Sequence, residues 1–89
     1  MRAIVTVVGK DKVGIIAGVC TALAEYNVNI LDIRQTVMQG YFTMMMVTDV
    51  SASQLPIAEL AKTLEEKGKD MNLSIRLQRE DIFDAMHRV

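Results

Sequence analysis

The chain has 89 residues, of which 51% are hydrophobic, 4% aromatic and 24% charged, and its net charge is −1. This length accommodates one domain. The composition is that of a folded chain, because disorder requires low hydrophobicity together with high charge. The sequence pI of 5.7 argues against a direct nucleic-acid partner, since domains that bind nucleic acid usually have a pI above about 9.

Cysteine usage and the absence of long apolar runs point to the inside of the cell. Cys20 is the single cysteine, so the sequence predicts neither an intrachain disulfide nor a multi-thiolate metal site. Residues 2–8 have the pattern of a strand and not of a signal peptide. No stretch reaches the roughly 20 apolar residues of a membrane span. We therefore predict a cytoplasmic protein with no membrane partner and no cofactor.

The first 27 residues predict a strand followed by a helix. Residues 3–8 are apolar and mostly β-branched, which indicates a buried strand that ends at Gly9. Asp11 is expected to cap the helix, and Asn27 is expected to end it in the left-handed conformation. Apolar residues then recur at helical spacing over about residues 13–26, and they are Val13, Ile16, Val19, Cys20 and Leu23.

The rest of the chain predicts a β-hairpin, a second helix, a fourth strand and a terminal helix. Strands are expected at 29–38 and 41–50, joined by the two-residue turn Gln39-Gly40. Residues 73–78 alternate as a strand, and the apolar positions within 82–89 indicate a short helix. The second helix, which extends to about residue 71, is expected to bury Ile57, Leu60, Ala61, Leu64, Gly68 and Met71.

The element order βαββαβ predicts an α+β, ferredoxin-like sandwich, in which two helices cover one face of a four-stranded antiparallel sheet. Residues 1–79 form this domain, and 80–89 form a C-terminal helical extension. The other sheet face is bare, yet the first and third predicted strands are apolar on both sides, at Ile4, Val8 and 44–46. Such a face predicts self-association into a homodimer or higher oligomer, with the terminal helix supplying part of the cover.

No residue pattern predicts catalysis, so we do not expect an enzyme. His87 lies near the end of the chain, and Cys20 lies on an apolar helix side. The methionines at 44–46 alternate across a strand and cannot converge on one metal ion. Two other functions of this fold are disfavoured: the first strand lacks the stacking aromatics of an RNA-recognition module, and residues 10–12 lack the paired cysteines of a metallochaperone.

The segment that leads into the first helix has the chemistry of an anion site. Free backbone N–H groups and the helix dipole favour a carboxylate there, and Gly14 allows a ligand to approach closely. Asn29, which we expect to lie across from this loop, offers donor and acceptor groups. Amides for a carboxylate and oxygens of Asp11 or Asn29 for an ammonium would suit an amino acid. Spacing alone favours structural roles instead, with Gly14 in tight packing and Asp11 in capping.

The same segment resembles the ACT domain family, whose pattern is Asp-x-Pro-Gly-Ile/Val, then a helix, then Gly-x-Asn-Ile. Residues 11–15 (Asp-Lys-Val-Gly-Ile) and 27–30 (Asn-Val-Asn-Ile) occupy these places, and the resemblance covers residues 1 to about 78. Val13 stands where Pro is common and Asn27 where Gly is common. More narrowly, residues 8–19 and 29–36 are similar to stand-alone ACT proteins of the glycine cleavage system repressor group.

The resemblance implies a regulatory module that binds a small amino acid and acts on a separate partner protein. It also implies side-by-side or face-to-face pairing, with the ligand near the interface between the loop and the second strand. The alternative is a protein-interaction or oligomerisation subunit with a vestigial ligand site, which the apolar sheet face and the segment 82–89 favour. The ligand-binding residues that the resemblance implies are Asp11, Lys12, Val13, Gly14, Ile15, Asn29 and Ile30.

Overall fold

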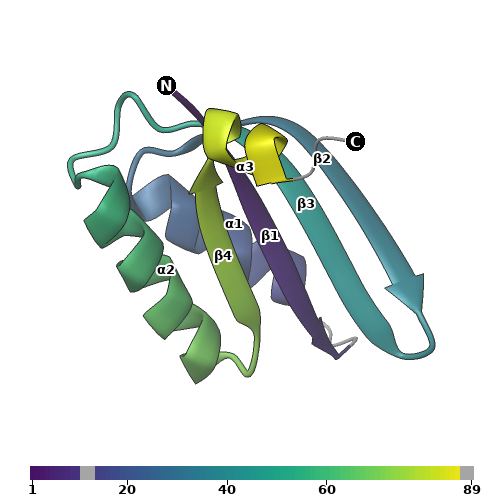
Figure 1. Ribbon diagram of the computed structural model, residues 1–89. Helices are drawn as coiled ribbons and strands as arrows, with labels where there is room; N and C mark the ends of the chain where they lie inside the picture. Colours follow the sequence, from purple (N-terminus) through teal and green to yellow (C-terminus); the bar gives the residue numbers. More distant parts are fainter. Residues whose placement is uncertain (11–13, 87–89) are drawn as a thin grey trace.

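The computed structural model describes residues 1–10 and 14–86. Its elements in chain order are β1 (Arg2–Lys10), α1 (Ile15–Glu25), β2 (Asn29–Met38), β3 (Tyr41–Asp49), α2 (Ile57–Asp70), β4 (Ser74–Arg79) and α3 (Glu80–Met86). The strands form one antiparallel sheet in the order β2-β3-β1-β4. Helices α1 and α2 lie on one face and α3 on the other (Figure 1). The predicted ferredoxin-like α+β fold is therefore confirmed.

The core lies between the sheet and the helix pair. Alternate residues of the strands point toward α1 and α2, as the period of two requires. Thr48 is fully buried among them, and its hydroxyl donates a 2.9 Å hydrogen bond to the Ala3 carbonyl, which satisfies the one polar side chain that the core encloses among the described residues. The strand residues that fill this core are Ala3, Val5, Val7, Phe42, Met44, Met46, Ile75 and Leu77.

The buried side of α1 differs from the prediction. Ile16 is 39% exposed and Cys20 is half-buried, whereas the buried residues are Ile15, Val19, Ala22 and Leu23. Val19 and Leu23 are buried as predicted. The buried side as a whole is turned by about one residue position, because Ile15 and Ala22 pack into the core in place of Ile16 and Cys20. Asp11 and Val13 lie outside the described residues. The N-cap position is Gly14, and no side-chain hydrogen bond caps the helix there.

Both sheet-packed helices end in the same turn. The residue after each C-cap is an asparagine with φ of 58°, Asn27 after α1 and Asn72 after α2. The amide of Val28 donates to the Leu23 carbonyl at 3.0 Å, and that of Leu73 donates to the Gly68 carbonyl at 2.7 Å. This is the Schellman arrangement. The left-handed conformation predicted for Asn27 is confirmed, and Asn72 repeats it.

Several predicted boundaries shift by one or two residues. β1 continues through Gly9, which pairs with Phe42, and ends at Lys10. Both Gln39 and Gly40 have positive φ in the hairpin turn, at 50° and 84°, as a type I′ turn requires. The terminal helix begins directly after β4, at Glu80. Within residues 1–10 and 14–86, no helix has the length and apolar character needed to cross a membrane.

Candidate functional site

Gly14 and Ile15 form the start of α1. Gly14 has φ of 88° and ψ of −1°, which is the left-handed region where a side chain is strained. A Cβ at this position would meet nothing within 4 Å, so the space beside the backbone is open. Ile15 is 7% exposed and anchors the helix start in the core. Asp11, Lys12 and Val13, the other predicted ligand residues of this loop, lie outside the described residues.

The first turn of α1 keeps the electrostatic character of a helix N-terminus. No side chain among the described residues caps its amides, and no acidic residue lies within the turn. The positive end of the helix dipole is therefore not offset by a carboxylate on the helix itself. Free amides beside an open glycine form a place where a carboxylate ligand can bind.

Asn29 and Ile30 start β2 and form the second half of the predicted site. Asn29 is exposed and pairs with Asp49 of β3, while Ile30 is half-buried against the core. Ser51 donates its backbone amide to the Asp49 carboxylate at 2.9 Å, and hydrogen bonds from Ser51 lower the pKa of Asp49. An open hollow of about 360 Å³ lies here, lined by Ala24, Asn27, Val28, Asn29 and Ala52.

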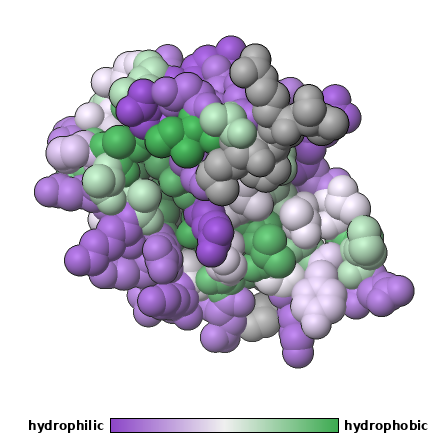
Figure 2. All heavy atoms as spheres, in the orientation of Figure 1, coloured by the Kyte–Doolittle hydropathy of each residue, from purple (hydrophilic) through white to green (hydrophobic). Residues whose placement is uncertain are grey.

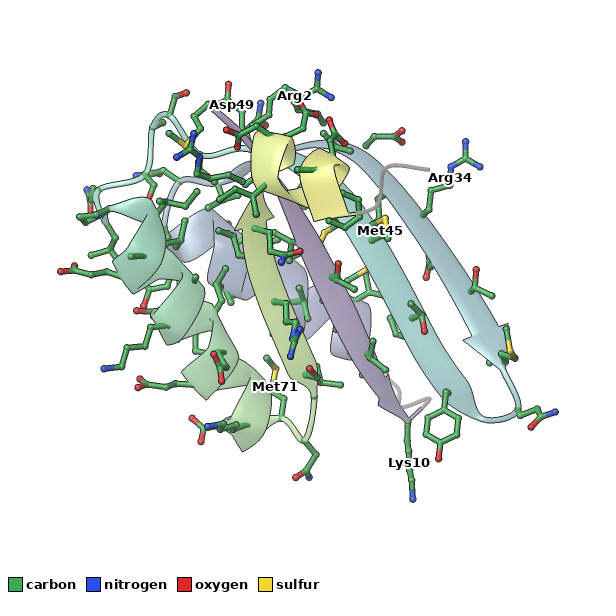
Figure 3. The ribbon with its side chains drawn as sticks, viewed as in Figure 1. Arg2, Lys10, Arg34, Met45, Asp49 and Met71 are labelled. Carbon is green, nitrogen blue, oxygen red and sulfur yellow. The ribbon has the colours of Figure 1, made fainter. Side chains whose placement is uncertain are left out.

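The two halves of the predicted site lie at opposite ends of the sheet. Asn29 pairs with Asp49, which pairs with Arg2 at the beginning of β1. Lys10, the residue before the loop, lies at the other end of β1 and pairs with Tyr41. Figure 3 shows Arg2 and Asp49 at one end of the sheet and Lys10 at the other. The expectation that Asn29 lies across from the loop is therefore wrong within one chain.

The helix between the two halves is the reason for this separation. α1 has 11 residues, which corresponds to about 16 Å at the helical rise of 1.5 Å per residue. It runs back along the sheet to the end where β1 started, and β2 begins there. Sequence reasoning assigned both motif segments to one site. The helix that lies between them in the family pattern carries the chain to the other end of the sheet before β2 begins.

Strand β2 is an exposed edge. Each of its residues is exposed except the half-buried Ile30. Ile33 and Val37 share rungs with the buried Met46 and Phe42, so they point toward the helix side. They are nevertheless 37% and 56% exposed, because none of the helices in the described part of the chain extends over β2 (Figure 1). The sequence predicted an exposed apolar surface on the first and third strands, and it did not indicate the exposed apolar residues of β2.

An edge of this kind favours pairing with another strand. A register irregularity between Ile30 and Asp32 interrupts the pairing with β3 near the start of β2, and from Asp32 to Met38 the strand is regular. Its outer row of backbone N–H and C=O groups faces no other strand among the described residues, since β2 is the first strand in the sheet order. Long apolar edge strands are the places where sheets join to other chains.

A second hollow lies between α1 and α2, in a place that the sequence did not indicate. It has a volume of about 330 Å³ and is lined by Gly18, Thr21, Ala22, Glu25, Lys67, Asp70 and Met71. The ammonium group of Lys67, which lines this hollow, already has partners within the chain. Its Nζ lies 3.4 Å from a Glu25 carboxylate oxygen and 5.9 Å from the centre of the Tyr26 ring. Among the described residues, no group of three His, Cys, Asp or Glu side chains is placed to hold a metal ion.

Comparison with known sequences assigns the chain to a family whose fold is the one described above. The sequence model of the ACT domain matches residues 2–78. A UPF0237 protein of Clostridium acetobutylicum is 57% identical over the whole length of both chains. A UPF0237 protein of Methanocaldococcus jannaschii is 46% identical and covers 99% of this chain and 98% of its own.

Solved structures give the same result. An ACT domain protein from Streptococcus pneumoniae is 47% identical, with a TM-score of 0.84 over 98% of both chains. A formyltetrahydrofolate deformylase from Pseudomonas putida KT2440 shares the fold, with 14% identity and a TM-score of 0.78 over 91% of this chain and 30% of its own. So does a protein described as a candidate glycine cleavage system transcriptional repressor, with 24% identity and a TM-score of 0.72 over 86% of this chain and 44% of its own.

The fold and the sequence matches place this protein in one class, the small βαββαβ modules that typically bind ligands and regulate other proteins. The chain belongs to the ACT domain family, and its relatives of similar length are UPF0237 proteins. The resemblance read from residues 11–15 and 27–30 is thereby confirmed at the level of the family.

Proposed function

We propose that this protein is a regulatory module that senses a small amino acid and acts on a separate partner protein. The observation that carries the proposal is Gly14. It has φ of 88° and open space beside it at the start of α1, within residues 11–15, the segment that resembles the Asp-x-Pro-Gly-Ile/Val pattern of the ACT family. The family fold supplies the general role, and this loop supplies the chemistry for a carboxylate.

In the proposed site, the carboxylate and the ammonium of the amino acid bind to two different sets of protein groups. Its carboxylate binds the amides of residues 12–15, where the helix dipole contributes about 0.3–1 kcal/mol. Its ammonium binds side-chain oxygens of Asp11 and Asn29, which accept hydrogen bonds from a cation. Because Asn29 lies at the far end of the sheet from Gly14 in the same chain, the asparagine in a given site comes from a second subunit.

Pairing of two β2 strands supplies that subunit. An antiparallel pair about a two-fold axis near Gln35 sets the start of one β2 beside the end of the other. Asn29 of the partner subunit then lies at the Met38 end of β2, and this is the end of the sheet where Lys10 leads into the loop. The pairing also buries Ile33 and Val37, which are exposed in the single chain.

The first test is thermal unfolding against a panel of the twenty amino acids. A ligand at 100 times its Kd adds about 2.7 kcal/mol, which raises the midpoint by roughly 10–20 °C in a domain of this size. The rise should be selective for one or a few amino acids and lost in Asp11→Ala and in Asn29→Ala. Gln54→Ala, which truncates an exposed amide in the connection before α2, is the matched control and should keep it.

A mixing experiment tests whether the site spans two subunits. Consider a mixed dimer of one Asp11→Ala subunit and one Asn29→Ala subunit, in which each site takes its loop from one subunit and Asn29 from the other. One of its two sites then carries both substitutions, and the other carries neither. An equal mixture should therefore recover about a quarter of the wild-type sites by calorimetric titration, because about half of the dimers are hybrids. A mixture that recovers no sites refutes the shared site but leaves the selective thermal response standing.

The exposed apolar residues of β2 favour a second candidate function. An oligomerisation or protein-interaction subunit would use Leu31, Ile33 and Val37, which are 50%, 37% and 56% exposed, without any ligand. Self-association that is unaffected by all twenty amino acids, with a flat thermal panel, would favour this second function over the amino-acid sensor.

A further inference from the structure

The two flanks of α1 face different neighbours. Gly18, Ala22 and Glu25 line the hollow toward α2, and α2 packs on β4 at one edge of the sheet (Figure 1). Successive residues of a helix are about 100° apart, so Ile16 and Cys20, one turn apart, lie on the opposite flank. β2 is the strand at the other edge of the sheet. The flank with Ile16 and Cys20 therefore faces the β2 side.

The helix side of β2 is apolar and open at the end where the loop before Gly14 begins. Val37 shares a rung with Phe42 and Gly9, which lies next to the end of β1. Ile16 belongs to the first turn of α1, which starts from the same loop. Ile16 is 39% exposed and Val37 is 56% exposed, so neither is covered in the single chain. These two side chains form an apolar surface beside the amides of the helix start, which we call the apolar shelf.

The described residues that continue the apolar shelf carry no charge. Gln35 and Ile33 follow it along the helix side of β2, and Cys20 follows it along α1. None of these side chains has a carboxylate, an ammonium or a guanidinium group. The other face of β2 carries Asp32 and Arg34, and Figure 2 views that face and shows hydrophilic residues among hydrophobic ones. A ligand side chain on the apolar shelf would meet hydrocarbon and would leave any charge of its own unpaired.

We propose that the apolar shelf selects an amino acid with an aliphatic side chain, an inference that rests on the proposed amino-acid site. In that site the amides of residues 12–15 hold the carboxylate, and Asp11 with Asn29 of the partner subunit holds the ammonium. The side chain is then directed between α1 and β2. Ile16 and Val37 are specificity-determining residues, because they contact this side chain and not the groups that all amino acids share. Small-molecule sites combine such an apolar lining with a few polar groups.

Pairing of two β2 strands adds a third apolar neighbour. About a two-fold axis near Gln35, Val37 of one strand lies opposite Ile33 of the other. The added strand covers the flank of Val37 in the plane of the sheet. The helix side of Val37 stays open to a ligand, because none of the helices in the described residues extends over β2.

Calorimetric titration with related amino acids measures this selectivity. Each buried methyl or methylene group strengthens binding by about fourfold, so valine, which has two more carbons than alanine, should bind about 15-fold more tightly. Valine should also bind about tenfold or more tightly than threonine, in which a hydroxyl replaces one methyl. Threonine is the sharpest comparison, because it would be preferred if the amide of Gln35, and not the apolar shelf, recognised the side chain.

Two substitutions place a hydroxyl on the apolar shelf without changing its charge. Ile16→Ser and Val37→Thr should each lower the preference for valine over alanine to about fourfold or less. The affinity for alanine should change little, a pattern that neither misfolding nor loss of the carboxylate site would give. Ile82→Ser on α3 and Met38→Thr on the other face of β2 are the matched controls. Ile82 and Met38 are 47% and 67% exposed, and both variants should keep the wild-type preference.

The outcomes separate this inference from the proposed function. A thermal panel that is flat for all twenty amino acids overturns both. A selective response to glycine, serine or a charged amino acid overturns the role of the apolar shelf and leaves the amino-acid sensor standing. Threonine that binds as tightly as valine has the same consequence. So does a preference for valine that Ile16→Ser and Val37→Thr both leave unchanged.

Discussion

Gly18 and Gly68 lie inside the two sheet-packed helices, and the same substitution by alanine should have opposite effects at the two positions. At Gly68 of α2, an added Cβ would meet Ile75 Cγ1 at 2.9 Å and the Leu73 carbonyl oxygen at 3.0 Å. A backbone carbonyl in a helix-ending turn cannot move aside easily. At Gly18 of α1, the added Cβ would meet Met71 Sδ at 3.1 Å, and a methionine side chain adapts readily.

The magnitudes follow from two opposing terms. Alanine gains up to about 1 kcal/mol over glycine in a helix interior at either position. Overpacking costs about 1–3 kcal/mol where neighbours cannot yield, so Gly68→Ala should lower the free energy of unfolding by about 1 kcal/mol. Gly18→Ala should raise it by somewhat less than 1 kcal/mol. In a domain of this size each kcal/mol moves the midpoint by about 4–8 °C.

Thermal and urea denaturation of the two variants beside the wild type measure this difference. The midpoints should move in opposite directions, with unchanged urea m-values, because the surface exposed on unfolding is nearly the same. If both variants shift the same way by similar amounts, helix propensity alone decides, and the close packing of α2 on β4 does not have the effect argued from these distances.

Three further predictions concern the turns and the buried polar contact. Asn72→Gly should raise stability by roughly 0.5–1 kcal/mol, because glycine takes the left-handed conformation without strain; an unchanged midpoint in urea would contradict this. Thr48→Val should cost about 1 kcal/mol, through loss of the hydrogen bond to Ala3, and a neutral result by calorimetry would show that this bond contributes nothing net. Asp49→Asn should destabilise the protein at neutral pH. Since hydrogen bonds from Ser51 lower the folded-state pKa of Asp49, its stabilising contribution is present above the unfolded pKa of about 3.9 and is lost as pH falls through the lower folded pKa. The wild-type and variant curves of stability against pH should therefore converge in acid, and parallel curves would refute the assignment.

The proposed ligand site and self-association are thermodynamically linked. A ligand held between Gly14 of one subunit and Asn29 of another binds the assembly more tightly than the single chain. By reciprocity, the ligand must strengthen the assembly by the same factor. Sedimentation with and without the stabilising amino acid would show this coupling directly, and no change in subunit number at concentrations near the dissociation constant would argue for a site within one chain.

Much of the architecture was predictable from residue spacing alone. The strand at 29–38 and the turn at Gln39-Gly40 are found where the alternation and the glycine placed them. The predicted stripe of α2 is confirmed in part: Leu60, Leu64 and Gly68 are buried. Its other members, Ile57, Ala61 and Met71, are half-buried against the core. These features depend on local chemistry: the period of a strand or helix, and the few residues that tolerate positive φ.

Other features depended on contacts between distant segments. The buried side of α1 is set by its packing in the core, which buries Ile15 and Ala22 and leaves Ile16 exposed. The loop and Asn29 were assigned to one site, yet a helix about 16 Å long carries Asn29 to the other end of the sheet. The exposure of Ile33 and Val37 follows from the sheet order, which leaves β2 at the edge and beyond the helices. Periodicity determines which residues share a side of an element, whereas only tertiary packing decides whether that side is covered, because cover comes from segments far away in the chain.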